Sequence, residues 1–461
     1  MRDLIMSAGA LLVGATLAAC QPPCGRLDPP VDASAGPGGG GNLLVVVLDD
    51  VGVEQLSAYG LGERTAHTPT IDCLCERGLR FTQVWASPSC SPARGELLTG
   101  RYNHRLGLGT ILSQRVDYQL PLEEDTLPEV LGRAGYATGL FGKWHLTAAS
   151  SDGALRHPND SGFDRFAGSI GNIYVTVGEA DVDNYDRWQR IADGKAEVVT
   201  RYPTVQLVDD ALDFVDEVGD QPWLVVLSFQ APHVPVAWPP SRLYRDTRPA
   251  HNLEHQQYLA MLEAVDHELS RFLRRLPRDM RADTTVVLTS DNGSNTTMID
   301  PSWPIRFGKG SVYELGVRVP FVVSGPSVGR PGETTDALAH LVDVLPTLAE
   351  IVGVEAPGAP DRPVDGVSLL PVVQGQEEAV RQTVFAGKFR PLGGPPEIWT
   401  RAVRDATHKL VVEPDGREEL FAVGPGTIVE GDDLLLGGAS AADLERLEAL
   451  REALALVAPD P

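Results

Sequence analysis

Residues 88–101 read PSCSPARGELLTGR, and this stretch decides how the rest of the chain is interpreted. Cys90 opens a CSPAR motif, with proline two residues and arginine four residues after it, and residues 95–99 are typical of a short helix. On the residues alone, a buried or disulfide-linked cysteine in a turn is the simpler explanation of so short a match. A thiolate cradle of the phosphatase type is excluded, because it requires an arginine six residues after the cysteine, where this chain has Glu96.

A buried strand is predicted at residues 42–50, NLLVVVLDD, because this apolar run follows glycines and is too short for a helix. Asp49 and Asp50 stand at its carboxyl end, which is where ligands bind in open α/β sheets. An isolated pair of aspartates at this position most often caps the next helix. Adjacent carboxylates are also hard-oxygen ligands for a divalent cation, so both interpretations stay open here.

Polar side chains follow three further strand-like runs in the same way. Residues 136–140 lead to Lys143 and His145, residues 223–229 to His233, and residues 284–289 to Asp291 and Asn292. Amphipathic helical patterns, such as those of residues 204–218 and 256–276, separate the runs. This alternation predicts an α/β fold with a doubly wound, mostly parallel sheet. Lys309 lies between two glycines further along the chain, which is also the setting of an ordinary exposed turn lysine.

The N-terminus has the features of a targeting segment. Residues 4–18 are apolar and rich in small side chains, and the run is shorter than the ~20 residues of a membrane-spanning helix. Residues 17–20, LAAC, resemble a bacterial lipobox, in which cleavage leaves a lipidated Cys20 at the start of the mature chain. An ordinary secretory signal is the alternative. Both predict an exported protein, and the first predicts a lipoprotein of the bacterial cell envelope, periplasmic or surface-facing, held to the membrane by its lipid anchor only.

The net charge limits the kinds of partner that the protein can bind, and the cysteine content limits the number of disulfides. The net charge of −24 argues against nucleic acid, because the phosphates would be repelled. It also disfavours polyanionic glycans, unless a local basic site overrides the global field. The chain has five cysteines, and if Cys20 is lipidated and Cys90 is oxidised, as the resemblance described next implies, one disulfide at most is possible.

The block CSPARGELLTGR, together with the ordered motifs above, resembles the type I sulfatase (arylsulfatase-like) family of the alkaline phosphatase superfamily. The resemblance runs from about residue 42 to residue 372, and more weakly to residue 423. In that family a formylglycine-generating enzyme oxidises the cysteine to formylglycine. The resemblance therefore maps the modification onto Cys90, and the positions that the modifying enzyme reads onto Pro92 and Arg94.

The resemblance also implies a set of site residues. The metal ligands would be Asp49, Asp50, the modified Cys90, Asp291 and Asn292, and the sulfate-binding and proton-handling residues would be Arg94, Lys143, His145, His233 and Lys309. All-oxygen ligation of this kind suits Ca²⁺, with Mg²⁺ as the alternative. Leu315 stands where the family pattern around its catalytic lysine usually has a glycine.

The activity implied in this way is the hydrolysis of sulfate monoesters by a sulfuric ester hydrolase. A phosphonate or phosphate monoester hydrolase of the same superfamily is one alternative. Another is a catalytically silent, calcium-binding surface lipoprotein in which Cys90 is never modified. Residues 148–203 and 388–397 are candidate specificity segments, although neither identifies the alcohol of the ester.

The domain organisation expected from these features has four parts. These are a lipoprotein signal peptide at residues 1–19, a Pro/Gly-rich tether at 20–41, a sulfatase catalytic domain at 42–383 and a C-terminal α/β subdomain with an antiparallel sheet at 384–461. A tether of this composition reaches roughly 25 Å. The catalytic body of a lipid-anchored form would therefore lie just off the membrane surface.

Overall fold

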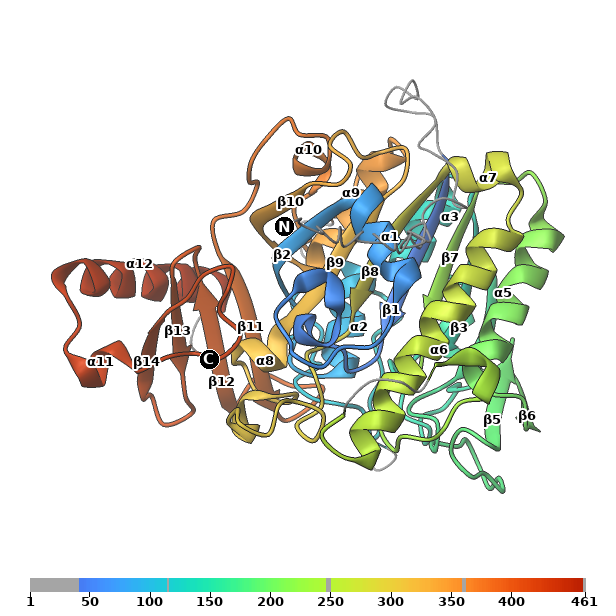
Figure 1. The fold of residues 1–461 in the computed structure, drawn as a ribbon, viewed down its shortest axis with the longest axis horizontal. Coiled ribbons are helices and arrows are strands. Elements are labelled where there is room, and N and C mark those ends of the chain that lie inside the picture. Colours follow the sequence, from blue (N-terminus) through green and yellow to red (C-terminus); the bar gives the residue numbers. More distant parts are fainter. Residues whose placement is uncertain (1–40, 114–115, 246–249, 359–361, 459–461) are drawn as a thin grey trace, which may run out of the picture.

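The computed structural model describes residues 41–113, 116–245, 250–358 and 362–458. These ranges form a large α/β domain and a smaller unit at the C-terminal end (Figure 1). The signal peptide and tether expected from the sequence, with Cys20, lie outside the described residues. Within the described ranges, no helix combines the length and the apolar composition needed to cross a membrane. Cys73 is disulfide-bonded, whereas Cys75 and Cys90 carry free thiols.

A ten-stranded sheet forms the centre of the large domain, in the order β10-β2-β9-β8-β1-β7-β3-β4-β5-β6. Its four central strands are β8 (Thr284–Ser290), β1 (Asn42–Leu48), β7 (Trp223–Ser228) and β3 (Ala137–Lys143), and neighbours among them pair in parallel. The outer strands are β10 (Thr334–His340), β2 (Leu79–Trp85), β9 (Arg318–Ser324), β4 (Arg165–Ser169), β5 (Trp188–Ala192) and β6 (Lys195–Val199). Among the described strands of this sheet, only β9 and β5 are antiparallel to the others. The predicted mostly parallel sheet is confirmed.

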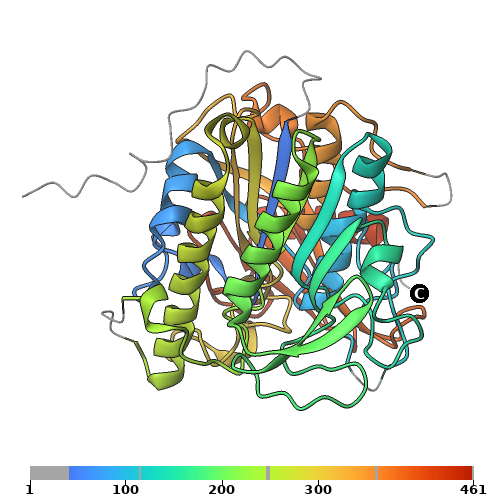
Figure 2. The same ribbon diagram turned by 90° about the vertical axis from the view of Figure 1, so that its right-hand side faces the viewer.

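Helices cover both faces of the sheet. One face carries α1 (Pro69–Arg77), α5 (Pro203–Val218) and α6 (Leu253–Arg275), and the other carries α2 (Cys90–Thr99), α3 (Leu127–Arg133) and α9 (Val344–Ile351). Figure 2 shows α5 and α6 crossing in front of the strands. Side chains of β1 alternate between the two cores, since Leu44 and Val46 pack on the first face and Leu43 and Val45 on the second. This is why β1 is apolar from Leu43 to Leu48, as expected of a strand buried on both sides.

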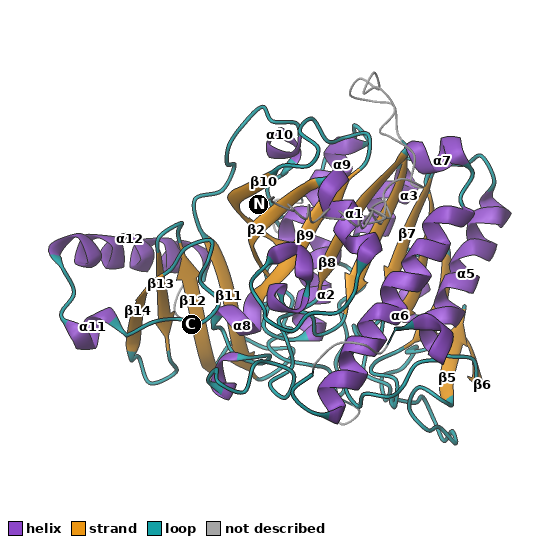
Figure 3. Cartoon of the chain, in the orientation of Figure 1, coloured by secondary structure: helices purple, strands orange, loops and turns teal. Residues whose placement is uncertain are grey.

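The smaller unit is a four-stranded antiparallel sheet with a helix against it (Figure 3). Its elements are β11 (Val384–Arg390), β12 (Ile398–Arg404), β13 (His408–Val412), β14 (Glu418–Ala422), α11 (Leu434–Gly437) and α12 (Ala441–Val457). Four short helices, α4 (His157–Asp160), α7 (Arg278–Ala282), α8 (Glu314–Val317) and α10 (Leu370–Val373), lie in the connections of the large domain. The predicted C-terminal subdomain with an antiparallel sheet is thus confirmed.

Buried ion pairs join the C-terminal sheet to the large domain. Glu314, at the start of α8, pairs with Arg404 at 3.2 Å and with Lys409 at 3.3 Å, and Lys409 also pairs with Glu430 at 2.7 Å. The side chains of Glu314, Arg404 and Lys409 have no exposed surface, so breaking one pair would leave a buried charge uncompensated. Because α8 begins five residues after Lys309, this network fixes the loop of Lys309 against the C-terminal sheet.

Two of the element boundaries that differ from the sequence-based expectation concern residues of the candidate site. The helix expected at residues 95–99 begins five residues earlier, at Cys90, because Ser89 is extended (φ −155°) and its carbonyl accepts the N–H of Ala93. Pro92 is tolerated in this first turn, where its missing N–H would have no partner in the helix. The strand expected at residues 136–140 continues as far as Lys143, which is therefore the last residue of β3.

Candidate active site

The candidate site lies where the carboxyl ends of the central strands meet. Because β8, β1, β7 and β3 are parallel neighbours, the residues that follow them gather at one edge of the sheet. The side chains brought together there are Asp49 and Asp50 after β1, Asp291 and Asn292 after β8, Lys143 and His145 at the end of β3, and His233 after β7. Cys90 joins them from the first residue of α2, and Lys309 from the loop before α8. Most of these side chains are buried, whereas that of Lys309 is 16% exposed.

Asp50 turns the chain at the end of β1 and ties this strand to its neighbours. Its backbone adopts the left-handed region (φ 65°), an unusual conformation for a non-glycine residue. The N–H of Asp50 donates to Asp291 Oδ1 at 3.2 Å, and Asn292 Nδ2 donates to Asp50 Oδ1 at 2.9 Å. The residue that caps the next helical turn is Gly52. The aspartates are therefore not helix caps, and both carboxylates face the site.

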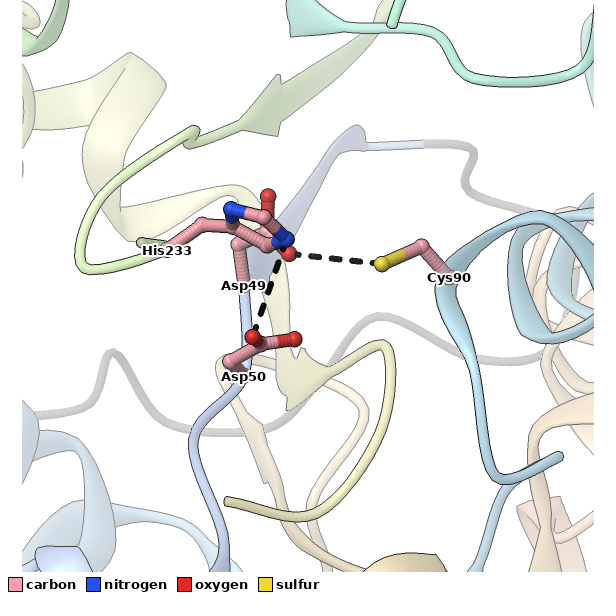
Figure 4. A group of neighbouring side chains, drawn as sticks. All are labelled: Asp49, Asp50, Cys90 and His233. Carbon is pink, nitrogen blue, oxygen red and sulfur yellow. Dashed lines mark hydrogen bonds and ion pairs between the residues drawn. The ribbon is translucent and has the colours of Figure 1, made fainter. Parts of the chain in front are cut away.

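Two ammonium groups flank the thiol of Cys90. Lys143 Nζ lies 2.6 Å from Asp49 Oδ2 and 3.4 Å from Cys90 Sγ. Lys309 Nζ lies 2.5 Å from Asp50 Oδ1 and 3.2 Å from Cys90 Sγ. Figure 4 shows the thiol facing the carboxylate of Asp49, whose Oδ1 is 3.7 Å away. An oxygen attached at the Cys90 position would therefore lie among two cations and two carboxylates.

The thiol of Cys90 is not set up as a thiolate. Burial raises its pKa to about 12, the charge of Asp291 adds to this effect, and Lys143 and Lys309 oppose it without cancelling it. The unmodified side chain therefore stays protonated at neutral pH. This agrees with the exclusion of a thiolate cradle from the sequence.

Arg94 connects three strand ends instead of facing the thiol. Its Nε donates to Asp291 Oδ2 at 2.9 Å, and its Nη1 donates to the carbonyl of Lys143 at 2.9 Å and to Ser228 Oγ at 2.5 Å. Burial alone would raise the pKa of Asp291, but Arg94, Lys143 and Lys309 together hold it below its usual value. Arg94 thus keeps Asp291 ionised and fixes β8, β3 and β7 relative to one another.

His145 presents an unpaired ring nitrogen to the site. Its backbone is left-handed (φ 61°), and its Nε2 lies 3.2 Å from the carbonyl of Leu112. A carbonyl can only accept, so Nε2 carries the proton and Nδ1 is an acceptor, with no hydrogen-bond partner of its own. Burial lowers the pKa of His145 well below its usual value, helped by the charge of Lys143, so the ring is neutral.

His233 faces the site through its other nitrogen. Its Nδ1 donates to the carbonyl of Val234, which leaves Nε2 as the atom on the side of Asp50, 3.7 Å from Oδ2. Burial and the nearby Lys309 lower the pKa of His233 to about 3, so this ring is also neutral in the protein alone. Figure 4 shows the imidazole next to both aspartates.

The residues of the site fit a divalent metal ion. Ligand atoms of Asp49, Asp50, Cys90 and His233 all lie within 4.8 Å of one another. Asp50 Oδ2 and Asn292 Oδ1 are buried and accept no hydrogen bond. Burial, with repulsion by Asp291, raises the pKa of Asp49 to about 7, so the site is short of positive charge. Carboxylate and amide oxygens are ligands for hard cations such as Ca²⁺ and Mg²⁺. The position of His233 within ligand range was not expected from the sequence.

Sequence reasoning missed the residues that support this site. Glu96, in α2, accepts the N–H and hydroxyl of Ser87 at 3.0 and 2.8 Å and the N–H of Asn103 at 3.1 Å, which ties down both segments that flank the helix of Cys90. Tyr258, in α6, donates to the carbonyl of Asp50 at 2.8 Å. Ser228, the partner of Arg94, could have been noticed as the single hydroxyl in the apolar run of β7.

Comparisons with known proteins agree with this arrangement. Residues 41–354 match the Sulfatase family model, and residues 305–412 match the C-terminal model of N-sulphoglucosamine sulphohydrolase. The chain is 31% identical to the steryl-sulfatase of Rattus norvegicus over an alignment that covers 74% of this chain and 72% of that one. Across the first three curated relatives, the chain spans 52 to 72% of their length.

Solved structures share the fold. Ps i-CgsB in complex with k-i-k-neocarrahexaose has a TM-score of 0.75 at 24% identity, covering 90% of this chain and 92% of that one. The phosphonate monoester hydrolase SpPMH from Silicibacter pomeroyi has a TM-score of 0.68 at 22% identity, covering 90% and 95%. At these identities the structures show a common fold and do not decide the substrate.

Proposed function

Because this chain belongs to the sulfatase family and is a sulfatase, we propose that it cleaves sulfate monoesters through a formylglycine made from Cys90, beside a bound divalent cation. The placement of Cys90 carries the proposal, since its Sγ lies 3.4 and 3.2 Å from the ammonium groups of Lys143 and Lys309. Asp49, Asp50, Asp291 and Asn292 are the proposed metal ligands, together with the modified residue 90. Their oxygen atoms suit Ca²⁺, with Mg²⁺ as the alternative.

The chain's own residues would supply charge neutralisation and proton transfer. A formylglycine hydrate supplies two hydroxyls on one carbon, and a divalent cation lowers the pKa of a hydroxyl bound to it. Lys143 and Lys309 offset the negative charge on the nonbridging sulfate oxygens. His145, with its free Nδ1, accepts the proton of the hydroxyl that does not attack. The ammonium of Lys309 donates the proton that the departing alcohol needs, and His233 would do so instead only after its Nε2, unprotonated in the neutral ring, takes up a proton.

Two measurements test the proposal. The purified protein, produced together with a formylglycine-generating enzyme, is expected to give a residue 90 peptide with the mass of the aldehyde or its hydrate. It is also expected to cleave an aryl sulfate with a higher kcat/KM than the matching aryl phosphonate. A higher value for the phosphonate would assign the protein to the phosphonate monoester hydrolases, whose fold it shares. A thiol that is never modified, with neither ester cleaved, would instead support a catalytically silent surface lipoprotein.

We further propose that the protein is exported and held at a membrane by lipid on Cys20. The support is the sequence of residues 4–20, an apolar segment that ends in a lipobox-like LAAC. Cys20→Ala is expected to move the protein from the detergent phase to the aqueous phase in a phase-separation assay, or to leave an unprocessed precursor. Unchanged partitioning of the variant would contradict the lipid anchor, and the protein would then be an ordinary secreted one.

A further inference from the structure

A cleft of about 620 Å³ lies between the segment around Ile111 and the turn that joins β11 to β12. Its lining is mainly apolar and includes Ile111, Val116, Pro391, Leu392 and Ile398. Ile111 is 39% exposed and Ile398 60% exposed. Large aliphatic side chains left in water on two facing walls gain free energy when an apolar group covers both of them.

Both walls of the cleft are attached directly to the active site. Leu112 belongs to the first wall, where its N–H donates to Ser91 Oγ at 3.0 Å and its carbonyl lies 3.2 Å from His145 Nε2. The residues on either side of Leu112 line the cleft, so the cleft begins one residue, about 3.8 Å of chain, from a partner of His145. The second wall continues from Lys388, whose Nζ donates to the carbonyl of Gly310, the neighbour of Lys309, at 2.8 Å.

Backbone hydrogen bonds join the chain just before Ile111 to β11 and to the turn that follows it. The N–H of Phe389 donates to the carbonyl of Gly109 at 3.2 Å, and the N–H of Gly393 donates to the carbonyl of Gly107 at 2.9 Å. The two backbones approach so closely that a Cβ at Gly109 would lie 2.2 Å from the carbonyl oxygen of Phe389. The two walls are therefore already joined at this end of the cleft before a ligand binds, which lowers the cost of binding.

The charges of the cleft are unsuited to a polyanion. Arg390 and Glu397, one of each sign, are the charged side chains among its lining residues. The ammonium of Lys388 already donates a hydrogen bond to the carbonyl of Gly310. A sulfated glycan with several charges would meet little local attraction in a protein of net charge −24.

We propose that this cleft holds the alcohol part of the ester, and that the preferred substrates are sulfate esters of apolar ring alcohols rather than of sulfated sugars. The inference rests on the proposed sulfate ester hydrolysis and adds the class of the leaving alcohol. The sulfate would lie at Cys90 between Lys143 and Lys309, and the ring would extend past Leu112 to contact Ile111 on one wall and Ile398 on the other.

The test compares two esters that differ in ring polarity. Cyclohexylmethyl sulfate and galactose 6-sulfate both carry a primary sulfate on a six-membered ring, and the parent enzyme is expected to have the higher kcat/KM for the first. Ile111→Ser and Ile398→Ser are each expected to raise KM for cyclohexylmethyl sulfate about fivefold or more, with kcat nearly unchanged, because each removes apolar contact made equally in the ground and transition states. KM for galactose 6-sulfate should change little.

The matched control is Leu436→Ser, which makes a similar change at a side chain that is 88% exposed on α11. This variant should keep the KM of the parent for both esters. The inference is overturned if the parent prefers galactose 6-sulfate, or if the two isoleucine variants keep the parent KM for cyclohexylmethyl sulfate. Failure of the underlying function looks different, because the modified parent enzyme would then cleave neither these esters nor an aryl sulfate.

Discussion

Asp291→Ala is expected to abolish turnover and to leave the protein without its metal ion. Asp291 is a proposed ligand, and its carboxylate also accepts the N–H of Asp50 and pairs with Arg94 at 2.8 Å. Its loss removes one hard-oxygen ligand and leaves Arg94 with only the carboxylate of Asp49, 3.8 Å away, as its ion-pair partner, so that its charge repels a divalent ion more strongly. A metal supplies several kcal/mol of charge stabilisation, so activity should fall by about a thousandfold or more.

Metal content and thermal stability of the same sample separate this explanation from simple misfolding. Elemental analysis should find close to one equivalent of Ca²⁺ or Mg²⁺ in the parent and almost none in the variant. Added metal should raise the Tm of the chelator-treated parent, because it binds the native state only, and should not raise the Tm of Asp291→Ala. Asp49→Ala, which removes a ligand from the neighbouring strand, should behave in the same way. Full metal occupancy in an inactive variant would show that the ligands are misassigned.

The centre of the fold was predictable because its physical pattern is local. β1 is apolar after Asn42 because both of its faces are covered, and the two aspartates that follow it stand where a parallel strand delivers side chains to a ligand. The same reasoning located Lys143, His145 and His233 at strand ends. The helix of residues 69–77 is also marked by local signals, because Pro69 opens it and Gly78 follows its last residue.

The outer strands were not predictable in the same way. β6 is almost entirely exposed, and β10 begins with exposed polar residues, so neither carries the apolar run of a buried strand. β2 pairs with β10 and β9, which lie roughly 240 to 255 residues later in the chain. Tertiary packing decides such a pairing, and the local sequence does not. Edge strands gain their stability from the neighbours they find, and their own sequence specifies them only weakly.

The supporting hydrogen bonds of the site also depend on distant pairs. Arg94 meets Ser228, 134 residues later, and Tyr258 meets Asp50, 208 residues earlier. Nothing in the spacing of a sequence indicates such pairs. The sequence also could not indicate which ring nitrogen of His145 carries the proton, because this is decided by the carbonyl of Leu112 in a different loop.

Cys90→Ser is expected to stop after a single turnover. The proposed reaction needs two hydroxyls on the carbon of residue 90, one to attack sulfur and one to release sulfate afterwards. The substituted serine, in a host whose modifying enzyme accepts only cysteine, offers one hydroxyl at nearly the same place. It would still lie close to the cations of Lys143 and Lys309, whose Nζ atoms are 3.4 and 3.2 Å from Sγ in the parent.

The first step can therefore still occur in this variant. The serine oxygen forms a bond to sulfur, the ester S–O bond breaks, and the alcohol leaves with a proton. The second step cannot follow, because no neighbouring hydroxyl on the same carbon can lose its proton and expel sulfate. The sulfated side chain must then await direct attack by water on sulfur, a step that the two-hydroxyl mechanism does not use.

Burst kinetics and mass spectrometry measure this outcome together. The variant should release up to one equivalent of alcohol per enzyme and then stop, and its residue 90 peptide should gain the mass of one SO₃ group. The parent should show no such adduct at steady state, because its second hydroxyl clears the sulfate in every cycle. Cys90→Ala is the matched control, since it keeps the fold and the lysines but offers no hydroxyl, and it should release no alcohol. Steady turnover of Cys90→Ser near the parent rate would rule out the two-hydroxyl mechanism, because one alkoxide would then be sufficient for the whole reaction.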